Sequence, residues 1–284
     1  MTYNKLIINI TFLSFLSSCS SIDSKNNSLD EYGLNGNVKS TIEQSYKANE
    51  KFGKVVKGEK KLEFSWRQNQ YNIYDDYGYL IERNNIDDVG ELVTKSIFNY
   101  NKNFELLEIN HYNSNGTLSD KSNWKYDNKG NNIENINYNS SGIYLNKMKR
   151  NFNDNNLVVE EMFIDSLNNI ISKSIYEYDS KNNRVKEIYY YNGKFNNKNL
   201  SKYNDKNQEI SFTILDSANN IIEKRTQKYN DNSLLIETKK ININGEIIRE
   251  EKLKYDEQNN WIEKIIYDGQ KPTFLIFRKI EYFK

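Results

Sequence analysis

Few side chains in this sequence are of the types that act as nucleophiles or metal ligands. The chain has one histidine, His111, and one cysteine, Cys19. A metal centre built from several imidazoles is therefore excluded, and a catalytic triad would depend on His111 alone. The counterparts of this histidine in the repeat described below include Asn85, Asn137 and Phe163. We interpret His111 as a variable strand position, and we predict no catalytic residue, metal site or cofactor.

Carboxylates are abundant and could supply acid and base pairs for hydrolysis. Six glutamates recur at a fixed interval: Glu82, Glu108, Glu134, Glu160, Glu237 and Glu263. Six lysines follow a matching interval: Lys95, Lys121, Lys147, Lys173, Lys198 and Lys224. An active site is one place on a protein, whereas these rows run through the chain, and cross-strand charge pairing explains them. A cell-envelope hydrolase that uses one such pair remains the enzymatic alternative.

Aromatic side chains are the remaining candidates for a binding site. Exposed tyrosine and tryptophan can stack on sugar rings or form protein interfaces. Most tyrosines here fall at repeat positions and are expected to pack across strands. The tryptophans interrupt the repeat pattern, and Trp66, Trp124 and Trp261 are therefore the candidate binding residues.

The N-terminal 18 residues are a predicted lipoprotein signal peptide. Lys5 supplies a positive charge, and positions 6–16 form an apolar run that is shorter than the roughly 20 residues of a membrane-spanning helix. The run ends in Leu-Ser-Ser before Cys19, which resembles the lipobox of bacterial lipoproteins. That resemblance implies a diacylglycerated Cys19 at the mature N-terminus. We expect a flexible tether over 19–31, a single domain over 32–284, and a cell-envelope location on the outer membrane.

Charge gives no indication of a nucleic-acid partner. The chain carries 40 Lys and Arg residues against 39 Asp and Glu residues. Nucleic-acid binders usually show a basic excess or a basic stripe, and neither is visible. The Asn- and Asp-rich segments match no EF-hand or calcium β-roll pattern, and no glycine-rich phosphate loop is present.

Composition favours strands and turns over helices. The chain contains 47 asparagines and 22 tyrosines but only two alanines, Ala48 and Ala218. Alanine is the best helix former, asparagine favours turns, and tyrosine is enriched in strands. The sequence therefore predicts an all-β protein.

A repeat of about 26 residues organises the chain. Its marker is an aromatic residue followed by Asp or Asn, at Tyr74, Tyr100, Tyr126, Phe152, Tyr178, Tyr203, Tyr229 and Tyr255. Four residues later most units have Gly or Asn, which tolerate a left-handed backbone, with Phe104 and Ser233 as exceptions. A second turn lies in mid-repeat, often at a glycine; in the fifth unit this is Gly193, one place early. Each repeat is thus predicted to be one antiparallel hairpin.

The predicted array is a long antiparallel meander of about eight hairpins. Val38 to Tyr46 is an expected opening strand, and a final half unit ends at Tyr282. The seventh position after each aromatic is aliphatic and the twelfth is apolar, although their parity places them on opposite faces of a regular strand. Either a bulge separates them or both faces carry apolar residues. Open twisted sheets rarely exceed about ten strands, so we expect a curled or coiled sheet stabilised by neighbouring repeats.

Two repeat units resemble a known motif. The segments 126–134 (YDNKGNNIE) and 178–186 (YDSKNNRVK) are similar to the YD repeat of RHS-type proteins. The chain most resembles uncharacterised Bacteroidota lipoproteins with such repeats, which tend to open like 33–40 (GLNGNVKS) and close like 260–264 (NWIEK). This resemblance implies the hairpin-array architecture. Large RHS proteins form a shell around a C-terminal toxin, and no such cargo is visible here.

Anchor, array and scarcity of catalytic residues together favour a non-enzymatic lipoprotein that presents an extended surface to a protein or a glycan. Besides the hydrolase, an immunity or antitoxin-like partner of a toxin is the other alternative, and it rests on the RHS resemblance alone.

Overall fold

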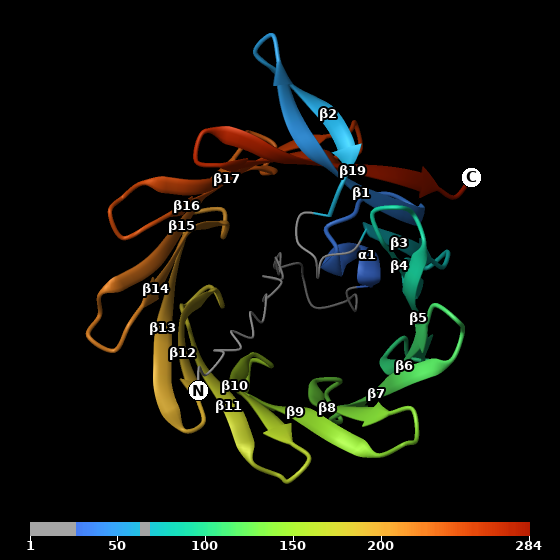
Figure 1. The fold of residues 1–284 in the computed structure, drawn as a ribbon. Coiled ribbons are helices and arrows are strands. Elements are labelled where there is room, and N and C mark those ends of the chain that lie inside the picture. Colours follow the sequence, from blue (N-terminus) through green and yellow to red (C-terminus); the bar gives the residue numbers. More distant parts are fainter. Residues whose placement is uncertain (1–26, 63–68) are drawn as a thin grey trace, which may run out of the picture.

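A computed structural model describes residues 27–62 and 69–284 (Figure 1). The signal peptide, Cys19 and Trp66 lie outside the described residues. One short helix, α1 (Ser28–Glu31), precedes a single antiparallel sheet of 19 strands. The first ten strands are β1 (Val38–Lys51), β2 (Lys54–Lys60), β3 (Asn69–Tyr74), β4 (Leu80–Ile86), β5 (Leu92–Tyr100), β6 (Leu106–Asn113), β7 (Leu118–Tyr126), β8 (Asn132–Asn139), β9 (Tyr144–Phe152) and β10 (Val158–Asp165). The others are β11 (Ile170–Tyr178), β12 (Arg184–Tyr191), β13 (Lys194–Tyr203), β14 (Glu209–Leu215), β15 (Ile221–Tyr229), β16 (Leu235–Ile241), β17 (Ile247–Tyr255), β18 (Trp261–Asp268) and β19 (Lys271–Tyr282).

The sheet closes on itself, and the prediction of a curled or coiled sheet was wrong in this respect. Strand β1 pairs with β19 on one side and with β3 on the other, while β2 is paired only with the outer half of β1. Eighteen of the 19 strands therefore form a continuous barrel wall. Closure removes both free edges, which a long meander would otherwise expose to other chains. The prediction of an all-β meander is confirmed.

Both kinds of turn use the same chemistry. In the loop after Tyr126, the Asp127 carboxylate accepts hydrogen bonds from the backbone N–H groups of Lys129 and Asn131, each at 2.9 Å. The Gly130 N–H donates to the Asp127 carbonyl at 3.1 Å. The mid-repeat loop that begins at Asp165 has the same arrangement. These are three-residue hairpin loops that end in a left-handed residue.

The left-handed position occurs in all eight units. Gly130 has φ +81°, and the sequence exceptions Phe104 and Ser233 have φ +60° and +66°. Loop geometry, and not residue type, therefore fixes this conformation. The fifth unit differs because Asn192 and Gly193 form a two-residue loop with φ +47° and +72°, as in a type I′ turn. That shorter loop accounts for the 25-residue interval.

The register shows which side chains share a face of the wall. Directly opposed residues, and residues two apart on one strand, point the same way. Stepping from Arg83 by these two rules leads through all 18 strands and back to Arg83. The side chain of Arg83 bonds Tyr32 at the end of α1, which lies inside the ring in Figure 1. The face that contains Arg83 is therefore the lumen face, and the other is the outer face.

The seventh position after each aromatic coincides with a register shift, as at Ile81, Leu107 and Ile210. Register shifts are confined to the strand ends beside the loops, as between Ile73 and Tyr74 of β3. The seventh-position residue, such as Leu107, is the extra residue at such a shift. Beyond it, Ile109 lies on the lumen face, whereas twelfth-position residues such as Ile164 point outward. Apolar residues therefore occupy both faces of the wall.

The largest hydrophobic cluster lies where the barrel closes. It contains Leu29 of α1, Leu34, Val38, Tyr74 and Leu80, all at most 7% exposed. Beside it, the N–H of Asn35 donates to the fully buried Asn260 side chain at 2.7 Å, and the Asn260 amide donates to the Asn35 carbonyl at 2.9 Å. The segment before β1 thus joins the first and last repeats. The end of the predicted tether, residues 28–31, forms α1 and belongs to this closure.

Candidate binding site

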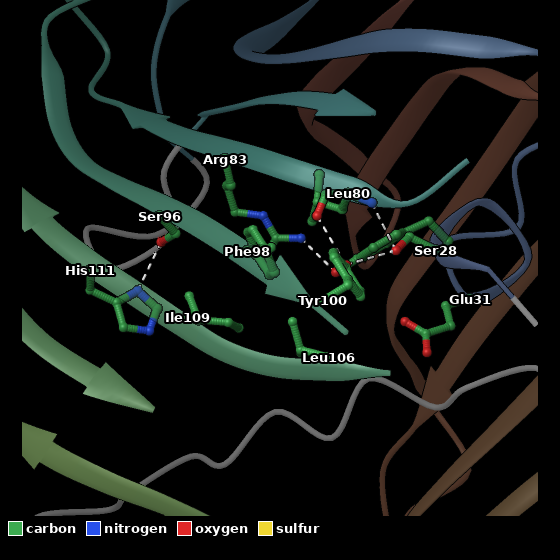
Figure 2. Close-up of a pocket in the computed structure, with 11 residues that line it drawn as sticks. Ser28, Glu31, Leu80, Arg83, Ser96, Phe98, Tyr100, Leu106, Ile109 and His111 are labelled. Atoms are coloured by element: carbon green, nitrogen blue, oxygen red, sulfur yellow. Dashed lines mark hydrogen bonds between the residues drawn. The ribbon is translucent and has the colours of Figure 1, made fainter. Parts of the chain in front are cut away.

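Helix α1 lies against the lumen face of the first repeats and creates a groove there. The Ser28 hydroxyl accepts a hydrogen bond from the Leu80 N–H at 2.9 Å and lies 3.4 Å from the Tyr100 hydroxyl. Tyr100 in turn donates to the Leu80 carbonyl at 2.9 Å. Beyond the helix, Arg83 donates to the Tyr32 hydroxyl at 2.6 Å. These bonds fix the helix and the wall relative to each other (Figure 2).

Two adjoining cavities follow this contact. The first has a volume of about 230 Å³ and the second of about 270 Å³. Both are bordered by Ser28, Glu31, Tyr100 and Leu106, so they form one groove along α1. The first extends toward Ser96, Phe98 and His111, and Figure 2 shows these side chains on neighbouring strands. The second extends toward the loop aromatics Tyr79 and Phe104 and toward Tyr126 at the end of β7. Taken together, the lining combines aromatic rings with a comparable share of polar groups, among them the carboxylates of Glu31 and Glu105.

Within the groove the structure brings His111 between a serine and an aspartate. The Ser96 hydroxyl lies 2.8 Å from His111 Nδ1, and Asp120 Oδ1 lies 3.8 Å from Nε2. The three residues are directly opposed on β5, β6 and β7. Nucleophile, base and orienting acid are the elements of a triad, but 3.8 Å is too long for a hydrogen bond to the imidazole. Ser96 is also 5% exposed, which limits access of a substrate to its hydroxyl.

The same serine recurs in repeats that have no histidine. Ser122 donates to the Asn137 amide oxygen at 2.5 Å, and Ser174 donates to a Glu187 carboxylate oxygen at 2.7 Å. All three serines are buried. The interpretation of His111 as one variant of a strand position agrees with this row, whose common feature is a polar cross-strand bond. Burial lowers the pKa of the His111 imidazole, with a smaller contribution from Arg83, and the Asp120 carboxylate opposes this shift.

Within the described residues, every arginine lies on the lumen face. The arginines there are Arg83, Arg150, Arg184, Arg225, Arg249 and Arg278. Several lie over aromatic rings: the Arg184 guanidinium is 4.1 Å from the Tyr176 ring centroid and that of Arg278 is 3.6 Å from the Trp261 ring. Carboxylates neutralise others, as in the 2.7 Å bond from Arg150 to Glu161. Planar guanidinium groups suit both stacking and forked hydrogen bonds.

Sequence reasoning missed this row, although a signal was present. Arginine appears at about one per repeat among many lysines, and codon bias alone does not place it on one face. The charge rows identified from the sequence lie instead on the outer face. Lys95 pairs with Glu82 at 2.7 Å, Lys121 pairs with Glu108 at 3.5 Å, and Lys173 pairs with Glu160. The remaining glutamates of the row, Glu134, Glu237 and Glu263, also pair with lysines.

The two tryptophan candidates within the described residues lie on separate strands. Trp261, on β18, packs against Arg278 and lies 5.2 Å from Lys264. Trp124, on β7, is half-buried on the lumen face opposite Asn135. Strands β7 and β18 are not neighbours in the sheet, so the two tryptophans do not form one site. Neither borders the groove beside α1, and Trp66 lies outside the described residues.

Within residues 27–62 and 69–284, no three His, Cys, Asp or Glu side chains are grouped so that they could hold a metal ion. None of the helical segments in these ranges has the length and apolar character needed to cross a bilayer.

Comparisons with known proteins give limited similarity. A family model described only as "Uncharacterised protein" matches residues 195–283, and no curated protein matches the chain. Among solved structures, a porin-like protein from Bacteroides uniformis has a TM-score of 0.46 at 8% identity, over 87% of this chain and 99% of that one. The TcdB2-TccC3-Cdc42 complex has a TM-score of 0.34 at 10% identity, over 86% of this chain and 16% of that one. The Photorhabdus luminescens Tc holotoxin pore has a TM-score of 0.28 at 10% identity, over 85% and 16%.

Proposed function

We propose that this protein is a membrane-anchored, non-enzymatic binding protein that holds a glycan against the lumen face of its barrel. The anchor is the lipidated Cys19 predicted from the sequence. The observation that supports glycan binding is the composition of the lumen face, which includes guanidinium groups and aromatic rings in contact, as at Arg184–Tyr176 and Arg278–Trp261, together with amides such as Asn137 and Asn146. A protein ligand for the outer face is the less favoured alternative.

Each component of this face suits a sugar. Aromatic rings stack on the apolar faces of pyranose rings, while amides and guanidinium groups bond pairs of hydroxyls. The groove beside α1 combines these elements through Phe98, Tyr100 and Arg83. Because several lumen arginines are already paired with carboxylates, the face has little excess charge for an anion. A neutral oligosaccharide is therefore the expected ligand.

The charged residues of the outer face favour water over lipid as the surroundings of the wall. Lys–Glu pairs occur on strands around the ring, from Lys95–Glu82 to Lys254–Glu263. A charged side chain at the lipid-facing surface of a membrane barrel is costly, by about 2–4 kcal/mol for lysine at the bilayer centre. A barrel held beside a membrane by acyl chains meets no such cost. We therefore place the wall outside the hydrocarbon, with Cys19 as the point of attachment.

Adjacent residues of β5 provide a matched test. Phe98 lines the groove and Ile97 points to the outer face. Phe98→Leu keeps apolar volume but removes the ring, so affinity for a bound oligosaccharide should fall about three- to tenfold, the equivalent of about 0.7–1.4 kcal/mol. Ile97→Ala should leave affinity unchanged. Screening neutral oligosaccharides against the full chain, followed by calorimetry on both variants, checks this. Equal affinities in the two variants would exclude the groove as the glycan site.

A further inference from the structure

One end of the barrel has an apolar rim. At the mid-repeat turns, the outward-facing residue that ends one strand is directly opposed to the residue that begins the next. Every such pair from β4 to β17 is aliphatic or aromatic: Ile86–Leu92, Tyr112–Leu118, Tyr138–Tyr144, Ile164–Ile170, Tyr190–Phe195, Leu215–Ile221 and Ile241–Ile247. These seven pairs are called the apolar rim. Closure of the barrel does not require the apolar rim, because the hydrophobic cluster at the closure lies at the opposite turns, beside α1.

Some of the turns beyond the apolar rim also carry exposed apolar residues, although the equivalent positions of other turns, Asn115 and Ser141, are polar. Val89, Leu167 and Ile243 lie in these loops and are 76%, 79% and 72% exposed. At the other end of the barrel, most of the equivalent loop positions are polar and exposed, as at Lys129 and Lys181, although Tyr77 is 65% exposed there. The two ends thus present different chemistry to their surroundings. Exposed apolar surface of this kind marks an interaction site more often than a structural need.

The β1–β2 hairpin adds a projecting tip at this same end. Strand β1 runs antiparallel to β19 and continues past the wall, where it pairs with β2 (Figure 1). At the tip, Phe52 is fully exposed and has φ +51°, between Lys51 and Lys54. A left-handed phenylalanine in water is unfavourable both for its backbone and for its ring. Folding gives no reason for this residue, whereas contact with an apolar environment does.

Lysines form the next layer behind the apolar rim. Each lysine of the outer row lies three residues beyond a rim residue on its own strand, the pairs being Leu92–Lys95, Leu118–Lys121, Tyr144–Lys147, Ile170–Lys173, Phe195–Lys198 and Ile221–Lys224. Their glutamate partners, such as Glu82 and Glu108, lie farther from the rim. From the rim inward the order is therefore apolar, cationic and anionic. This order matches the acyl, headgroup and aqueous layers of an anionic bilayer surface.

We propose that the apolar rim and the Phe52 tip insert shallowly into the surface of an anionic lipid bilayer, so that the barrel stands on the membrane. This inference rests on the proposed anchor, because the surface is the one that holds the acyl chains of Cys19. Eight peptide steps separate Cys19 from Asn27 and reach at most about 28 Å. A nine-residue strand is about 30 Å long. Asn27 lies beside Tyr77 at the end of the barrel opposite the apolar rim. The anchor therefore reaches about one wall height, and the apolar rim and Phe52, not the anchor, select the end that faces the bilayer.

Depth-dependent quenching of introduced tryptophans tests the orientation. The full lipidated chain with Phe52→Trp, and separately with Lys181→Trp, is reconstituted on vesicles of zwitterionic lipid with a minority of anionic lipid. Lys181 is exposed at the opposite end of the barrel and serves as the control. With brominated acyl chains in the vesicles, the Phe52→Trp signal above wild type should be quenched and blue-shifted. The Lys181→Trp signal should be unaffected. Quenching of neither residue, or of Lys181→Trp alone, would overturn the proposal.

A second variant separates insertion from folding. Phe52→Asn creates an Asn-Gly pair suited to the type I′ geometry of this turn, so the hairpin should become more stable. In a Leu167→Trp background, the same change should reduce quenching of the rim tryptophan by brominated lipid. Higher thermal stability together with lower quenching supports a tip that serves the membrane. Unchanged quenching, or association of the chain into dimers through the rim in place of lipid contact, would overturn it.

The outcomes also distinguish this inference from the proposed function. Acylation is followed by metabolic labelling at Cys19, and glycan affinity is measured on the same samples. A labelled protein that binds glycan but shows no quenching would retain the proposed function and lose the rim inference. Quenching without labelling or glycan binding would retain the rim inference and lose the proposed function.

Discussion

The left-handed turn position permits a quantitative test at Gly130 and Ser233. Gly130 has φ +81° and Ser233 has φ +66° at equivalent places in their loops. A left-handed backbone costs an ordinary L-residue about 1–2 kcal/mol, and a strained β-branched residue about 1–3 kcal/mol. Gly130→Val should therefore lower the free energy of unfolding by about 1–3 kcal/mol.

Asparagine at the same place should be mild. It tolerates this conformation, and the chain already uses it at Asn156, Asn182, Asn207 and Asn259, with φ between +58° and +65°. Replacing glycine also lowers the entropy of the unfolded chain, a gain of about 0.4–1 kcal/mol that offsets the remaining strain. Gly130→Asn should thus stay within about 0.5 kcal/mol of the wild type.

Ser233→Gly tests the same reasoning in the opposite direction. It removes about 1–2 kcal/mol of strain and adds about 0.5–1 kcal/mol of chain entropy, so a small net stabilisation is expected. Phe104→Gly is a poor substitute, because the Phe104 ring stacks on Tyr79 with centroids 4.8 Å apart. At about 2–4 °C per kcal/mol for a chain of this size, calorimetry resolves the valine variant readily.

The spatial extent of the damage is part of the test. Because each strand pairs with its neighbours in sequence, Gly130→Val should first reduce hydrogen-exchange protection near residues 120–140. Equal melting temperatures for the valine and asparagine variants would refute the left-handed assignment. Loss of protection around the whole ring at once would instead show that the closed barrel melts as a single unit.

Two further predictions concern the anchor and the histidine. A palmitate analogue should label the wild type but not Cys19→Ala, and equal labelling would remove the anchor from the proposal. The pKa of His111 is lowered by burial, so the unfolded chain binds a proton more readily and stability should fall as pH drops below about 6.5. His111→Asn, which copies the Ser122–Asn137 pair of the next repeat, should flatten this part of the melting temperature against pH curve; an unchanged slope would assign it to other groups.

The loops were the part of the fold that the sequence could predict, because their conformation depends on local residue types. Asp or Asn, followed three residues later by Gly or Asn, specifies the same loop at almost every turn, as from Asp127 to Gly130. Phe104 and Ser233 adopt the conformation although their types disfavour it, since the flanking strands and the Asn101 and Asn230 side chains impose the loop. The regular interval therefore carried more information than the residue at any one position.

Closure was not predictable from the repeat. It depends on β1, which lies outside the repeat pattern. Glu43 of β1 pairs with Arg278, which is near the other end of the sequence. It also depends on Asn35 and Asn260, whose mutual bonds join two segments that look unrelated in sequence. The groove beside α1 shares this origin, because Ser28 and Glu31 fall in a stretch whose polar composition suggested a tether.

The two faces of the wall differ in their charged and apolar residues. A transmembrane barrel is apolar outside and polar inside. Here the outer face has paired lysines and glutamates over most of its height and apolar residues at one end, while arginine faces the lumen. Guanidinium groups are weakly hydrated and stack on rings, whereas ammonium groups are strongly hydrated and extend into water. The confinement of the described arginines to the lumen face follows from the environments of the two faces, although Lys240 and Lys264 share that face. Under our proposals, the binding surface lies inside the barrel and the membrane contact lies at its rim.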